Sequence, residues 1–113
     1  MKNIDVYRQY FSAECTFNGV KRRGAVVSLN AESDSGMIKY TVGVSFFPYT
    51  NAEDFAISYD ACGEKELLYT KGRRSKKRDE QYLAQVQTVA DEIAASMQGV
   101  IHWDKPLNEA QYG

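Results

Sequence analysis

The strongest constraint on the fold is a strict alternation of apolar with small or polar residues in the segment 38–46. Side chains of a β-strand point alternately to opposite faces of a sheet, so this period predicts a strand that is buried on one face only. Pro48 ends the pattern, because proline has no N–H to donate to a neighbouring strand. The inward row is Ile38, Tyr40, Val42, Val44 and Phe46, and the outward row is Lys39, Thr41, Gly43 and Ser45.

Two earlier segments alternate in the same way, and Asn18-Gly19 stands between them. Asn-Gly is a strong hairpin signal, because a type I′ turn requires positive φ angles at both of its central residues. We therefore predict a strand over residues 10–17 and a return strand from about residue 20 to residue 31. The inward side chains are Phe11, Ala13, Cys15 and Phe17 in the first strand, and Ala25, Val27 and Leu29 in the second.

Two shorter strands are predicted after Pro48. Phe55, Ile57 and Tyr59 indicate a fourth strand, and residues 64–70 indicate a fifth, in which Leu67 and Tyr69 share one face. Consecutive strands joined by short turns are typical of an antiparallel meander.

The apolar period then changes from two to about 3.6, which predicts one amphipathic helix of about 20–24 residues. Its buried stripe is Tyr82, Val86, Val89, Ile93 and Met97, widened by Leu83, Ala90 and Ala94. Ser75 is the expected N-cap and Gly99 the expected left-handed residue beyond its end. The apolar residues 100–103 then predict a short strand or extended segment that packs back.

These patterns predict one domain over residues 1–113 of the α+β class. Its architecture is an antiparallel β-meander of about five strands covered by one long C-terminal α-helix. With 113 residues and 43% hydrophobic residues, the chain is large enough for one core.

The cysteines and the apolar runs bear on the compartment. The two cysteines form no CxxC motif and no Cys/His cluster, which excludes an ordinary zinc site and favours reduced thiols. No apolar stretch has the length of a signal peptide or of a membrane span. We therefore expect a cytoplasmic protein with no membrane contact.

The residues typical of catalysis are sparse. His102 is the only histidine, and neither GxxxxGK[ST] nor GxGxxG occurs. Acidic pairs such as Glu32/Asp34 fall on turns or outward rows, whereas a general acid needs burial. Cys62 with His102 is a conceivable nucleophile and base, but nothing near either residue marks an activated thiolate. We expect a protein that is not an enzyme and that needs no metal and no cofactor.

The distribution of charge is the chief functional signal. Residues 71–78 hold six of the fourteen basic residues, and the other eight stand against fifteen acidic ones, although the formal net charge is −1. Binding to a polyanion follows local charge density rather than net charge. The six residues are Lys71, Arg73, Arg74, Lys76, Lys77 and Arg78.

The position of this run points to an anion. The first turn of a helix normally favours acidic residues, whereas here it is basic, and exposed amides with clustered cations form an anion site. Lys21, Arg22 and Arg23 add to the patch if the first hairpin turn lies near the end of the fifth strand. The hypothesis is nucleic-acid binding through phosphates, without base specificity.

Two alternatives remain open at this level. The basic run is a solvated connector, in which Asp79 and Glu80 pair with the lysines, or it contacts an acidic protein surface. In the second case the chain is a protein-interaction or accessory module, of the kind that mobile elements encode, with no nucleic-acid ligand. The spare sheet face, residues 47–49 and residues 100–103 are its candidate docking surfaces. A homodimer is compatible with every one of these hypotheses.

Overall fold

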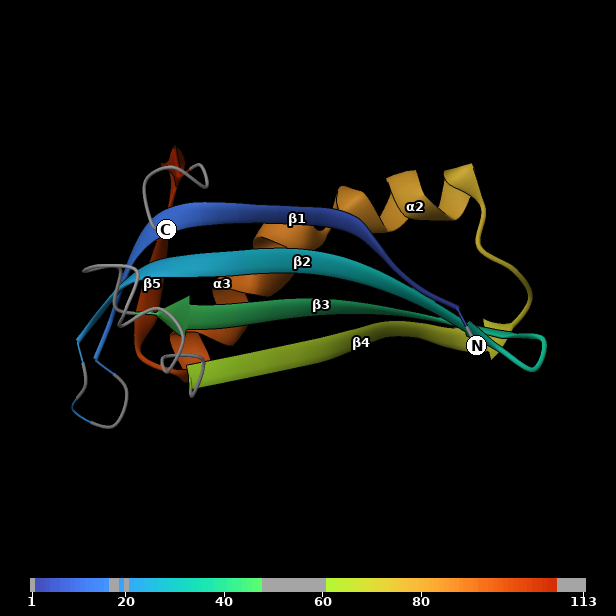
Figure 1. The fold of residues 1–113 in the computed structure, drawn as a ribbon, viewed down its shortest axis with the longest axis horizontal. Coiled ribbons are helices and arrows are strands. Elements are labelled where there is room, and N and C mark those ends of the chain that lie inside the picture. Colours follow the sequence, from blue (N-terminus) through green and yellow to red (C-terminus); the bar gives the residue numbers. More distant parts are fainter. Residues whose placement is uncertain (1, 17–18, 20, 48–60, 108–113) are drawn as a thin grey trace.

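The computed structural model describes residues 2–16, 19, 21–47 and 61–107. Within these ranges the chain forms an antiparallel five-stranded sheet in the order β4-β3-β2-β1-β5, with two helices behind one face (Figure 1). The predicted α+β class and the antiparallel sheet are therefore confirmed. The strands are β1 (Lys2–Cys15), β2 (Arg22–Asp34), β3 (Met37–Phe47), β4 (Ala61–Lys71) and β5 (Gly99–Leu107), and the helices are α2 (Lys76–Leu83) and α3 (Val86–Ser96).

Only β1 to β4 follow each other as a meander. The apolar tail forms β5, which crosses to the opposite edge of the sheet and pairs antiparallel with β1. Trp103 Nε1 ties β5 to α3 by donating to Asp91 Oδ1 at 2.8 Å. The strand predicted at Phe55, Ile57 and Tyr59 lies outside the described residues.

The core lies between the sheet and the helices, and its rows are those that the alternation predicts. Every inward side chain of β3 from Ile38 to Phe46 is at most 1% exposed. Ala25, Val27 and Leu29 of β2 are fully buried beside them. On β1, Phe11, Ala13 and Cys15 are each at most 6% exposed. Burial of a large apolar side chain contributes about 1.5–3 kcal/mol, so this shared layer dominates the stability of the sheet.

The first hairpin is confirmed, but its connection is longer than a two-residue turn. Cys15 pairs with Arg22, so β2 begins two residues later than predicted. Gly19 has the positive φ of 74° that favours glycine. Asn18 lies outside the described residues.

Strand β1 extends to Lys2, well before the predicted start at residue 10. The register shifts between Asp5 and Tyr7, where an extra residue interrupts the pairing with β2. As a result, the consecutive residues Val6 and Tyr7 both pack against the core. The alternation of buried and exposed residues, from which strands are predicted, is therefore interrupted here.

A second irregularity changes the faces of β4. Tyr40 pairs with Leu68 and Thr41 with Glu66, so Leu67 is an extra residue in the ladder. Leu67 and Leu68 both pack against the core, whereas Tyr69 points to the other face and is 60% exposed. The prediction that Leu67 and Tyr69 share one face is wrong for this reason.

The single long helix is also wrong, because the helix breaks between Leu83 and Val86. The N–H of Gln85 donates to the carbonyl of Tyr82 at 3.0 Å, which tightens one turn at the break. The break lets both halves face the twisted sheet, and all five residues of the predicted stripe are at most 8% exposed. Leu83, at the end of α2, is instead 41% exposed.

The end of α3 corrects the role given to Gly99. The left-handed residue is Gln98, with a φ of 57°, and Gly99 already belongs to β5. A Cβ at position 99 would lie 2.6 Å from Cζ of Phe46. Glycine is therefore required by close packing against the core, not by the handedness of the backbone.

Candidate functional site

The basic junction, residues 71–78, joins the end of β4 to the start of α2 and is held in place by its own backbone. The N–H of Gly72 donates to the carbonyl of Gly36 in the β2–β3 turn at 2.9 Å. Arg78 Nη1 donates to the carbonyl of Arg73 at 3.0 Å, and this guanidinium fills the space beside Gly72 where a Cβ would be. These two hydrogen bonds tie the junction to the β2–β3 turn and to the first turn of α2.

The start of α2 agrees with the predicted cap. Ser75 has an extended backbone and its Oγ accepts from the N–H of Arg78 at 3.1 Å. This bond satisfies one of the amides that have no partner within the helix. Lys76 and Lys77 follow as the first two helical residues, so their charges project from the positive end of the helix dipole.

Asp79 connects the junction to the core. Its carboxylate pairs with Arg74, whose Nη2 lies 2.8 Å from Oδ2, and it accepts a 2.6 Å hydrogen bond from the hydroxyl of Tyr40. Tyr40 is fully buried in β3. Burial, followed by the hydrogen bond to Asp79 and its negative charge, raises the pKa of Tyr40 to about 12. One of the alternatives from the sequence expects Asp79 to pair with a lysine of the basic run. It pairs instead with Arg74.

Four cations of the junction remain exposed. Among the described residues, the side chains of Lys71, Arg73, Lys76 and Lys77 enter no ion pair or hydrogen bond. Arg74 is held by Asp79, and Arg78 is partly buried while it closes the loop. The positive charge available to a ligand is therefore that of these four side chains.

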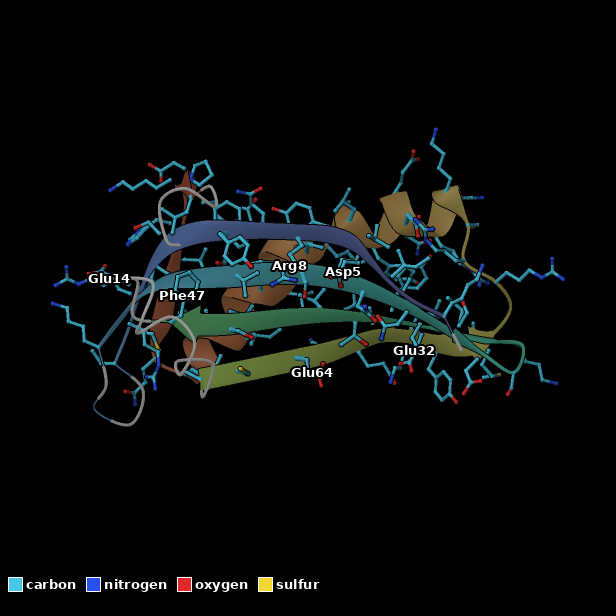
Figure 2. All side chains as sticks on the ribbon, in the orientation of Figure 1. Asp5, Arg8, Glu14, Glu32, Phe47 and Glu64 are labelled. Atoms are coloured by element: carbon cyan, nitrogen blue, oxygen red, sulfur yellow. The ribbon has the colours of Figure 1, made fainter. Side chains whose placement is uncertain are left out.

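The sheet face away from the helices is acidic next to the junction. A hollow of about 260 Å³ opens there, lined by Glu32, Asp34, Ser35, Met37, Lys39, Glu66 and Tyr69. Lys39 is already paired with Glu32 at 3.4 Å. Figure 2 shows Asp5, Glu32 and Glu64 on this same face. These carboxylates repel a polyanion from the part of the sheet face that adjoins the junction.

The second basic run does not join this surface. Lys21, Arg22 and Arg23 stand at the start of β2, whereas the junction lies beyond its far end (Figure 1). The thirteen residues of β2 span roughly 40 Å. Arg22 is moreover 1% exposed, so it is not available on any surface.

Lys21 and Arg23 lie beside residues for which the sequence predicted no role in binding. They line a hollow with Ser12, Ala13, Glu14, His102 and Lys105. Lys105 belongs to no run of basic residues and directly follows Asp104, so no sequence signal marks it as part of a cationic site. Only the pairing of β5 with β1 brings it near Lys21 and Arg23.

The thiol chemistry considered from the sequence has no geometric support. Cys62 lies on β4 and His102 on β5, which are the two opposite edge strands of the sheet. Cys15 is buried, and its Sγ donates to the carbonyl of Met97 at 3.4 Å. Within the described ranges, no group of three His, Cys, Asp or Glu side chains is placed to hold a metal ion. Neither α2 nor α3 has the length and apolar character needed to cross a membrane.

No protein-family model, no curated protein and no solved structure matches the chain. The arrangement of its own side chains is therefore what bears on its function.

Proposed function

We propose that the protein binds nucleic acid without sequence specificity, by contacting backbone phosphates with the basic junction. The observation that supports this is a set of four exposed cations that form no ion pair with the residues that the structure describes, on a backbone anchored by hydrogen bonds. An anchored backbone reduces the conformational entropy that is lost on binding, because only the side chains become ordered.

Binding of this kind proceeds by release of counterions. Lys71, Arg73, Lys76 and Lys77 each neutralise one phosphate and displace the cations condensed on it. Four contacts correspond to a slope of log K against log salt of about −2.8 for single strands and about −3.6 for a duplex.

The junction has no means of reading bases. Residues 71–78 include no aromatic side chain, so stacking on unpaired bases is not available within it. The nearest ring in the sequence is Tyr69, which projects from the acidic face of the sheet. Affinity is therefore expected to depend on salt and hardly on sequence.

The direct test is fluorescence anisotropy with labelled single- and double-stranded oligonucleotides at low and near-physiological salt. We expect Lys76→Gln with Lys77→Gln to reduce the salt slope by about 0.7–0.9 for each lost contact. Arg23→Gln with Lys105→Gln removes the same charge at the other end of the sheet and serves as the matched control. This control should bind as the parent chain does.

Two results would contradict the proposal. The first is binding that both double variants weaken equally, because only the total charge would then matter. The second is absence of binding even at low salt. In that case the same four cations are better explained as a contact for an acidic protein surface, which capture with polyglutamate would detect.

A further inference from the structure

The end of the sheet opposite the basic junction carries a second concentration of positive charge. A hollow of about 510 Å³ is lined by Ser12, Ala13, Glu14, Lys21, Arg23, His102 and Lys105, and we call it the end hollow. Its walls come from β1, from the start of β2 and from β5. Figure 2 shows Glu14 at this end of the molecule, far from Glu32.

Strand pairing explains why these residues meet. β1 lies between β2 and β5, with Ser12 opposite Gly24 on one side and Ala13 opposite Ile101 on the other. Arg23 and His102 therefore flank the same stretch of β1. The register shift between Ser12 and Cys15 bends the strand at this point, which is typical of β-bulges that re-aim side chains.

The charges of the end hollow do not cancel. Lys21, Arg23 and Lys105 are exposed, and they form no ion pair with any described residue. Glu14 is the only carboxylate among the described residues of the lining, and its Oε2 lies 3.2 Å from Nε2 of His102. Three cations therefore line the described part of the hollow, and Glu14 beside them already has a partner in His102.

We propose that the end hollow binds the phosphate group of a small molecule, either a phosphomonoester or a pyrophosphate. Arg23 provides a planar fork that matches two phosphate oxygens, and the two lysines add point charges. The hydroxyl of Ser12 is a further donor from the wall. A group of charge −2 or more matches three cations that line one hollow better than the single charge of a phosphodiester does.

The volume of the end hollow is compatible with a small ligand. Its volume falls within the range of about 300–1,000 Å³ that is usual for small-molecule sites. Among the described residues of the lining there is no aromatic side chain on which a base could stack. The basic junction, in contrast, presents its cations along one chain segment, from the end of β4 into α2. The two sites are roughly 40 Å apart, so this inference does not depend on nucleic-acid binding.

The test is a ¹H–¹⁵N NMR titration of the full chain with pyrophosphate and, separately, with inorganic phosphate at low ionic strength. We expect saturable shifts of the amides of Ser12, Arg23 and His102 and their neighbours. Arg23→Gln with Lys105→Gln should weaken the affinity about tenfold or more, and Lys76→Gln with Lys77→Gln should leave it unchanged. Both double variants alter exposed side chains, and their thermal unfolding verifies that the fold is retained.

Three outcomes would overturn the assignment. Shifts that do not saturate would show only general screening by salt. Equal losses in both double variants would show that no particular site is involved. Displacement of pyrophosphate from the end hollow by a short single-stranded oligonucleotide would make the hollow part of a nucleic-acid surface instead.

Discussion

Asp79→Asn separates the two roles that Asp79 combines, because it should weaken the fold and strengthen nucleic-acid binding. The carboxylate lies between the buried hydroxyl of Tyr40 at 2.6 Å and the guanidinium of Arg74 at 2.8 Å. Asparagine keeps an oxygen that accepts from Tyr40 but has no charge for Arg74. The substitution therefore frees one cation of the basic junction and removes the anion beside it.

The expected loss of stability follows from these two contacts. A hydrogen bond to a charged group contributes about 1.5–3 kcal/mol and one to a neutral group about 0.5–1.5, so the bond from Tyr40 loses about 1 kcal/mol. The pair with Arg74 adds at most about 1 kcal/mol, because the Arg74 side chain is 40% exposed and solvent screens the pair. We expect the free energy of unfolding to fall by about 1–2 kcal/mol in urea titrations.

The expected gain in binding follows from the same contacts. Freed from Asp79, Arg74 becomes a fifth phosphate contact, so the salt slope should steepen by about 0.7–0.9. Tyr40→Phe is the matched control, because it removes the hydrogen bond to Asp79 and leaves the Arg74–Asp79 pair in place. It should lower stability without changing the salt slope.

Anisotropy titrations at several salt concentrations measure both variants. A less stable Asp79→Asn chain whose affinity and slope equal those of the parent would refute the reasoning. Arg74 would then lie off the surface that contacts phosphates, and the position of the basic junction would not explain binding.

Two further predictions concern the fold. Tyr40 keeps its proton in the folded chain up to a pKa of about 12, whereas it loses the proton near pH 10 when unfolded, so the free energy of unfolding should fall as the pH rises from 10 to 12. The loss should reach about 2–3 kcal/mol in urea titrations across that range. The prediction is wrong if the free energy of unfolding of Tyr40→Phe decreases as steeply with pH. Gly99→Ala should lower stability by about 1–3 kcal/mol because its Cβ would meet Phe46, whereas Gln98→Gly should raise it by about 0.5–1 kcal/mol by relieving the positive φ. Thermal melts that rank these two variants in the reverse order would mean that position 99, not 98, is the left-handed one.

Much of the fold is predictable because it depends on local pattern. The alternation in residues 38–46 identifies the inward row of β3, and the 3.6-residue period identifies the buried stripe of the helices. Ser75 caps α2 as its side chain predicts. These features need only the residues themselves and their neighbours along the chain.

The predictions are wrong where the local structure depends on contacts between segments that are distant in the sequence. The extra residues at Val6 and Leu67 break the alternation, because the ladder must fit a neighbouring strand that is distant in sequence. The break after Leu83 contains neither glycine nor proline, and it fits the helix to the twist of the sheet. The position of Lys21 relative to Lys105 depends on β5 joining β1 instead of β4, and no local pattern reports that choice.

The same arrangement limits how nucleic acid is contacted in the proposed mode. The free cations of the basic junction run from the last residue of β4 into the first turn of α2, and they lie at one end of a molecule that is 41 Å long. Carboxylates such as Glu32 and Glu66 line the neighbouring sheet face and repel a strand laid along it. Phosphates along one strand recur about every 3.4 Å, so an end-on contact by four cations covers only a few of them. The salt slope should therefore stop steepening once an oligonucleotide exceeds that small footprint, whereas a polymer lying along the whole sheet would add contacts with every further phosphate.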